Sequence, residues 1–110
     1  MKDDLTYCHH IADAIETIME YLDDVEFSQF QSEKMRIDAV VRELMIIGEA
    51  ASHISKSFKE KHPRIQWQKI RGMRNFLVHE YFGVNTKVVW DTCQNSLPEL
   101  YQTIKSELLF

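Results

Sequence analysis

Residues 33 to 58 read EKMRIDAVVRELMIIGEAASHISKSF and carry the longest helical periodicity in the chain. Apolar side chains recur there at steps of three and four, which places them on one face of an α-helix. They are Ile37, Val40, Val41, Leu44, Ile47, Ala51, Ile54 and Phe58. A helix over this whole range would be about 39 Å long. We expect it to be the longest element of the fold, with Ser28 or Ser32 capping its start.

Small residues are concentrated in one part of this helix, residues 48 to 52 (GEAAS). A glycine inside a helix destabilises it by roughly 1 kcal/mol relative to alanine, so Gly48 needs a structural reason. Small side chains allow the backbone of a neighbouring element to approach closely. We therefore interpret this segment as a notch for packing.

Helical periodicity also precedes this segment. It predicts a first amphipathic helix from about Asp4 to Tyr21, capped by Asp3, Asp4 or Thr6. Its apolar face consists of Ile11, Ala14, Ile15, Ile18, Met19 and Leu22.

Two further helices are expected after His62-Pro63, which should end the long helix. One begins near Trp67, and the last begins at Asn85, a good N-cap, with Pro98 kinking or restarting it. No alternating pattern typical of strands is found. The sequence predicts an all-α protein, an antiparallel bundle of four to five helices.

The length of 110 residues favours one domain covering 1–110, and it leaves no room for a second. Cys8 and Cys93 match no paired metal-ligand spacing, which is typical of reduced thiols in a cytoplasmic protein. The sequence shows neither a signal peptide nor a run of membrane-spanning length. We therefore expect a cytoplasmic protein without a membrane segment.

The net charge of −4 is unevenly distributed. Residues 1–50 contain four Lys/Arg and twelve Asp/Glu, whereas residues 51–110 contain nine and five. Seven of those nine lie between Lys56 and Arg74, where Glu60 is the one acidic residue. This stretch would draw a polyanion toward the segment that follows it. The alternative is a solvated basic face balanced by the acidic first helix.

The segment that follows, residues 71 to 82 (RGMRNFLVHEYF), is the best indication of function. It combines a permanent cation, Arg74, a titratable base, His79, and a phenol, Tyr81. Such a pair of cation and base suits cleavage of a phosphodiester without a metal. Arg74 and His79 are roughly 140° apart around a straight helix, so either the helix is distorted or a two-fold dimer completes the site. The alternative is a solvated arginine and a structural histidine.

A metal site in the bundle was weighed as well. No glutamate has a histidine three positions later, as a di-iron bundle requires. The remaining pairs are His9 with Asp13 and Glu49 with His53, which are also common on helix surfaces. We expect no metal and no cofactor.

Several ordered blocks in residues 35 to 105 resemble the HepT-like branch of the HEPN superfamily. They are IIGEAA (46–51), HP (62–63), Trp67, Ile70, RGMRNFLVHEYF (71–82), GV (83–84), VW (89–90) and LP (97–98). The resemblance implies a helical bundle that forms a two-fold dimer. It also implies a toxin of a toxin-antitoxin pair, acting as a metal-independent endoribonuclease on RNA.

Within that family the motif is Arg, four residues beginning with a polar one, His, one residue and Tyr. The resemblance makes Arg74 and His79 the catalytic pair and Asn75 a supporting residue, while Lys69 and Arg71 are candidates for binding RNA.

The family partner is a minimal nucleotidyltransferase antitoxin, which is understood to transfer AMP onto the motif tyrosine, here Tyr81. The alternative function is a non-enzymatic helical partner of that nucleotidyltransferase, or a scaffold that presents its substrate.

Overall fold

A computed structural model describes residues 3–79 and 85–109 of the chain, without the side chains of Phe76, Val78 and His79. Helices account for about four fifths of these residues, and no strand occurs among them. The all-α class is therefore confirmed. In chain order the elements are α1 (Asp4–Tyr21), α2 (Phe27–Phe30), α3 (Lys34–Ser52), α4 (Lys56–Lys61), α5 (Trp67–His79), α6 (Thr86–Asp91), the π-helical turn η2 (Thr92–Ser96) and α7 (Leu97–Leu108).

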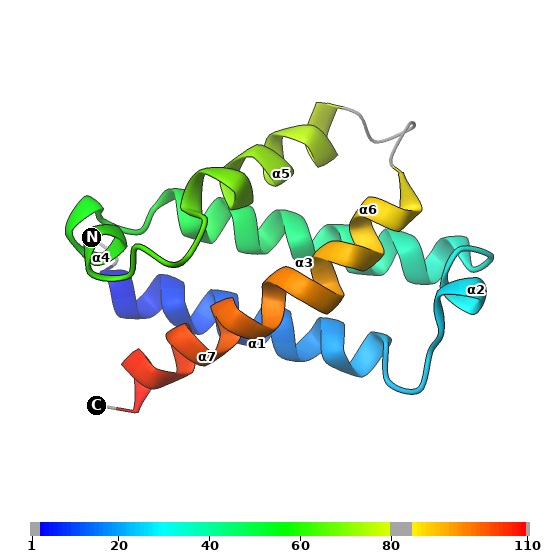
Figure 1. Cartoon of the computed structure of the whole chain (residues 1–110), viewed down its shortest axis with the longest axis horizontal. Coiled ribbons are helices and arrows are strands. Elements are labelled where there is room, and N and C mark those ends of the chain that lie inside the picture. The colour runs from blue at the N-terminus through cyan, green and yellow to red at the C-terminus, as the bar shows by residue number, and fades with distance from the viewer. Residues whose placement is uncertain (1–2, 80–84, 110) are drawn as a thin grey trace.

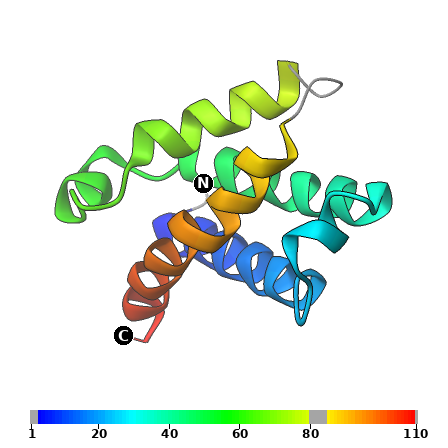
Figure 2. The same cartoon turned by 45° about the vertical axis from the view of Figure 1, so that its right-hand side comes forward.

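Helix α3 is the centre of the arrangement. It runs antiparallel to α1 on one side and to α5 on the other, while α7 crosses α1 (Figure 1). The view turned by 45° shows the same relation, with α5 separated from α1 by α3 (Figure 2). The buried faces of α1, α3, α5 and α7 form a continuous apolar core, and among them Ile11, Val40, Leu77 and Ile104 are completely buried. Among the described helices, none has the length and apolarity needed to cross a bilayer.

Helix α1 has the bounds that its periodicity predicts. Asp3 is the N-cap, and its carboxylate accepts a hydrogen bond from the backbone N–H of Thr6 at 3.0 Å. The buried residues of α1 are Cys8, Ile11, Ala12, Ala14, Ile15 and Ile18. A local cap and a local period were sufficient to specify this helix.

The long helix expected over residues 33–58 is shorter than predicted. It ends at Ser52, and a separate helix, α4, begins three residues after His53. Ser55 caps α4 by accepting from the N–H of Phe58 at 3.2 Å. The capping of α3 by Ser28 or Ser32 is also wrong, because Glu33 occupies the N-cap position without a side-chain bond.

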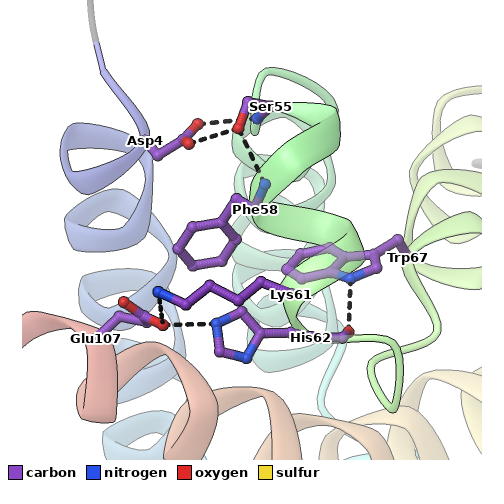
Figure 3. A network of polar contacts seen from close by, with 7 residues as sticks. All are labelled: Asp4, Ser55, Phe58, Lys61, His62, Trp67 and Glu107. Atoms are coloured by element: carbon purple, nitrogen blue, oxygen red, sulfur yellow. Dashed lines mark hydrogen bonds and ion pairs between the residues drawn. The ribbon is translucent and has the colours of Figure 1, made fainter.

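Two contacts distant in sequence hold α4 in place (Figure 3). Asp4 of α1 accepts hydrogen bonds from the N–H of Ser55 at 2.8 Å and from its hydroxyl at 2.6 Å. At the other end of α4, His62 Nε2 lies 2.6 Å from an oxygen of Glu107 in α7. These two contacts fasten the α3–α5 connection to the first and last helices.

The last helix begins at Asn85, as predicted, with the Asn85 side chain accepting from the N–H groups of Lys87 and Val88. The helix continues through the π-helical turn and restarts as α7 with Pro98 in its first turn. Proline has no N–H to donate, so it is tolerated in the first turn of α7. The π-helical turn directly precedes α7 in the sequence.

Candidate active site

Helices α3 and α5 approach each other closely at Gly48 and Arg74. A Cβ placed on Gly48 would lie 2.2 Å from Arg74 Cβ and 2.8 Å from Arg74 Cγ. Such a distance is impossible between real atoms, so only glycine allows this crossing. The predicted notch is confirmed, and α5 is the helix that packs into it.

This crossing sets the position of the Arg74 side chain. Its aliphatic stem lies against α3, while its guanidinium reaches Glu49 through Nη2 at 2.7 Å. A second guanidinium nitrogen, Nη1, donates to Asn75 Oδ1 at 3.1 Å. The side chain remains 38% exposed, so further N–H donors are available to a ligand. Arg74 is therefore a partly exposed side chain that forms an ion pair with Glu49.

Glu49 connects Arg74 to the rest of the bundle. Its other oxygen, Oε1, lies 3.2 Å from His53 Nε2. The His53 ring stacks on the ring of Tyr7 in α1, with centroids 5.0 Å apart and an interplanar angle of 13°. A line of side chains therefore runs from α5 across α3 to α1.

The backbone of α5 is helical through His79. With no break between them, the Cα positions of Arg74 and His79 are about 140° apart around the helix axis. Of the two explanations given for this angle, distortion of the helix is therefore not supported over residues 74–79. The side chain of His79, to which a catalytic role was assigned, lies outside the described part of the structure. The predicted AMP acceptor, Tyr81, lies outside it as well.

Seven basic residues between Lys56 and Arg74 differ in how they are paired. Three have carboxylate partners among the described residues: Lys56 with Glu60, Lys61 with Glu107 and Arg74 with Glu49. Four have no ion-pair partner within the described ranges: Lys59, Arg64, Lys69 and Arg71. The two RNA-binding candidates, Lys69 and Arg71, belong to this second group and precede Arg74 on the same helix.

The other groups that could take part in chemistry are possible metal ligands and the two cysteine thiols. Within residues 3–79 and 85–109, no three His, Cys, Asp or Glu side chains gather closely enough to hold a metal ion. Cys8 and Cys93 are free and buried. Burial raises the pKa of Cys8 to about 11, helped by the nearby Asp4 carboxylate, and burial raises the pKa of Cys93 to about 12. Both thiols are therefore poor nucleophiles in the folded protein.

Comparison with known proteins identifies the family of the chain. Residues 11–107 match the family described as "Ribonuclease HepT-like". The chain therefore belongs to the HepT-like ribonuclease family. No solved structure matches it.

Three relatives illustrate the similarity. "Putative RNase TTE0752" of Caldanaerobacter subterraneus is 40% identical over 98% of this chain and 96% of its own length. "Probable ribonuclease HepT" of Thermococcus cleftensis is 43% identical over 86% of each chain. "Putative RNase MJ1380" of Methanocaldococcus jannaschii is 31% identical over 94% and 95%.

Sequence reasoning missed the part played by Glu49. Its carboxylate was weighed with His53 as half of a metal site. The structure shows that contact at 3.2 Å, and it also shows an ion pair between Glu49 and Arg74 at 2.7 Å. The available signal was its position next to Gly48. A residue beside a helix crossing is well placed to contact the partner helix, but the sequence does not say which residue of that helix it meets.

Proposed function

We propose that this chain is a metal-independent endoribonuclease that acts in the cytoplasm as the toxin of a toxin-antitoxin pair, with Arg74 and His79 as its catalytic pair. Membership of the HepT-like ribonuclease family supports RNA as the substrate. The main support for the catalytic site is the position of Arg74 where α3 and α5 cross. Its aliphatic stem packs against Gly48, and its guanidinium forms an ion pair with Glu49.

The chemistry follows from the residue types. The 2′-hydroxyl of the RNA attacks the adjacent phosphorus and gives its proton to His79. The P–O5′ bond of the next nucleotide breaks, and the leaving 5′-oxygen takes up a proton to become a 5′-hydroxyl. A 2′,3′-cyclic phosphate results. Arg74 stabilises the negative charge that gathers on the non-bridging oxygens. Acid–base assistance contributes about 10²- to 10⁴-fold to such a reaction.

Glu49 and Asn75 orient the arginine in this mechanism. Each accepts a hydrogen bond from a different end nitrogen of the guanidinium, at 2.7 and 3.1 Å. A planar group held at two points has little rotational freedom left, so its remaining donors point in a fixed direction. Glu49 is a positioning residue here, because it acts through Arg74.

A two-fold dimer is part of the proposal. Because α5 is helical through His79, one copy presents Arg74 and His79 on different sides of the helix. Two copies related by a two-fold axis can combine the arginine of one with the histidine of the other in one cleft. Sedimentation at micromolar concentration should show a dimer, and a monomer would contradict this part.

Cleavage assays with purified variants test the catalytic assignment. His79→Ala and Arg74→Ala should each lower kcat by at least about 100-fold. Arg74→Lys keeps the charge and most of the stem but loses the planar fork, so it should also cleave poorly while remaining folded. Lys105→Ala is the control, since it removes an exposed cation of α7 that lies outside both the motif and the basic stretch before it. Full activity of the His79 variant would overturn the assignment, as would activity that is lost in EDTA and restored by a divalent ion.

We further propose that a minimal nucleotidyltransferase silences the enzyme by adding AMP to Tyr81. The added phosphate would bring negative charge close to the motif and repel RNA. Incubation with that partner and ATP should increase the mass by AMP, and Tyr81→Phe should prevent it. If wild-type protein binds the partner yet never cleaves RNA, the non-enzymatic scaffold is the correct function.

A further inference from the structure

A groove separates the first half of α5 from the last helix, and α3 forms its floor. Its volume is about 240 Å³. The two walls pack chiefly on other helices, α5 on α3 and α7 on α1. The π-helical turn forms part of the opposite wall, and π turns occur frequently at functional sites.

The groove is apolar at its base and polar at its rim. The base consists of aliphatic and methionine side chains, including Leu44, Ile47, Ile70 and Met73. The rim carries groups that can form hydrogen bonds, including Gln66 on one side and Asn95 and Ser96 of the π turn on the other. Such a site suits a flat ligand with apolar faces and a polar edge.

Charge at the rim narrows the choice of ligand. Arg64 and Lys69 line the groove, and neither has an ion-pair partner within the described residues. Glu99 is the acidic residue among the lining side chains, and it can accept from an exocyclic amino group. An apolar helix of a partner protein would leave the two cations without anions. A nucleotide supplies a phosphate for the cations and a base for the groove.

We propose that this groove binds one unpaired base of the RNA substrate, next to the phosphate that is cleaved. The inference rests on the proposed function and adds to it that the substrate is single-stranded at that position. Unpaired bases are held in proteins by apolar contact on their faces and by hydrogen bonds on their edges.

The position of the groove relative to Arg74 supports this placement. Met73, which precedes Arg74, lines the groove, and Lys69 lies about 7.5 Å from Arg74 along the helix axis and about 140° around it, so the RNA would have to curve around α5 between the two positions. A more open hollow of about 510 Å³ continues the surface toward α4, and both sites share Ile65, Gln66 and Lys69. A strand that places its scissile phosphate at Arg74 can therefore reach the groove with a neighbouring nucleotide.

Abasic substitution in a short single-stranded RNA tests the inference. A set of oligonucleotides, each lacking one base around the cleavage site, is assayed for kcat and KM with wild-type protein. The same set is titrated by fluorescence anisotropy against His79→Ala, which binds without cleaving under the proposed function. One position should stand out, with KM and Kd raised about tenfold or more when its base is absent.

Two neighbouring amides of the π turn provide the matched pair of variants. Asn95→Ala should raise KM for the intact RNA and should lose most of the extra penalty at the sensitive position. Gln94→Ala removes an exposed amide that does not line the groove, so it should behave like wild type.

The outcomes are distinguishable. An equal response to every abasic position, or equal behaviour of the two amide variants, overturns the base site. If Asn95→Ala changes the oligomeric state while the abasic profile is unchanged, the groove is a contact between proteins. If wild type binds with the expected profile but does not cleave, the proposed function fails and the base site stands.

Discussion

Gly48 and Arg74 occupy the point where α3 and α5 cross, and the missing side chain of one leaves the space for the stem of the other. The same contact that brings the two helices together therefore also aims the arginine. Packing and the proposed chemistry depend on a single residue position, because any side chain at residue 48 would push Arg74 away from Glu49.

Two glycine-to-alanine substitutions separate packing from helix propensity. Gly48→Ala should destabilise the protein by about 1–3 kcal/mol, since the new Cβ would overlap Arg74. Gly72→Ala is the control, because nothing lies within 4 Å of a Cβ there and alanine favours the helix by up to about 1 kcal/mol. Urea denaturation measures both. Equal stability of the two variants would contradict the close crossing.

Removal of the Glu49 carboxylate should lower kcat by about tenfold and leave KM unchanged or reduced. Arg74 loses one of the groups that hold it, which should lower kcat. The site also loses a negative charge, so its net charge is more positive and RNA should bind at least as well. A double substitution tests whether Glu49 acts through Arg74, because Glu49→Gln should have little further effect in an Arg74→Ala background.

Asp91→Asn, which breaks an exposed ion pair with Lys87 of 3.1 Å, is the matched control and should leave kcat unchanged. Faster cleavage by Glu49→Gln would mean that the carboxylate blocks Arg74 instead of positioning it.

Stability should decrease in acid partly through Glu107. The hydrogen bond from His62 holds the pKa of this carboxyl below its usual value, with Lys61 contributing. Because the pKa of Glu107 is lower in the folded state, its carboxylate stabilises the protein above the unfolded pKa of about 4.3. This stabilisation is lost as the pH falls through the folded-state pKa.

The free energy of unfolding of wild type should therefore fall more steeply below about pH 5 than that of Glu107→Gln. Glu99→Gln, on the same helix but without an ion pair among the described residues, should follow the wild-type curve. Parallel curves for wild type and Glu107→Gln would show that the His62 contact contributes no pH dependence.

Both cysteines should resist alkylation in the folded protein. Their raised pKa values, about 11 for Cys8 and about 12 for Cys93, leave almost no thiolate at pH 8. Iodoacetamide should modify them only at the rate at which the protein opens, so mass spectrometry in increasing urea should follow global unfolding. Rapid labelling of Cys93 without denaturant would indicate that the last helix opens locally.

Local signals allowed much of the fold to be predicted. Helix α1 carries its own cap and period, and Asn85 caps α6 through neighbouring N–H groups, so both starts were correct. The end of α3 was missed because the break at residues 53–55 is stabilised by Asp4, which lies 51 positions away from Ser55.

The site was predictable in its residue types and not in its contacts. Residues 71 to 82 show which side chains are present, but the pairing of Arg74 with Glu49 depends on how two helices cross. The angle between two helices is a property of their packed surfaces, which a single sequence does not display. The catalytic assignment of His79 and the modification of Tyr81 stay predictions.

The two contacts that hold α4 have a consequence for the order of assembly. Asp4 is synthesised before its partner Ser55, so it is already present when Ser55 leaves the ribosome. Glu107 is synthesised long after its partner His62. The two contacts of Figure 3 therefore become possible at different times. The Asp4–Ser55 contact can form early in synthesis, whereas the His62–Glu107 contact requires that α7 has been made and has docked. A nascent chain that has not yet made α7 can form the Asp4–Ser55 contact but not the His62–Glu107 contact.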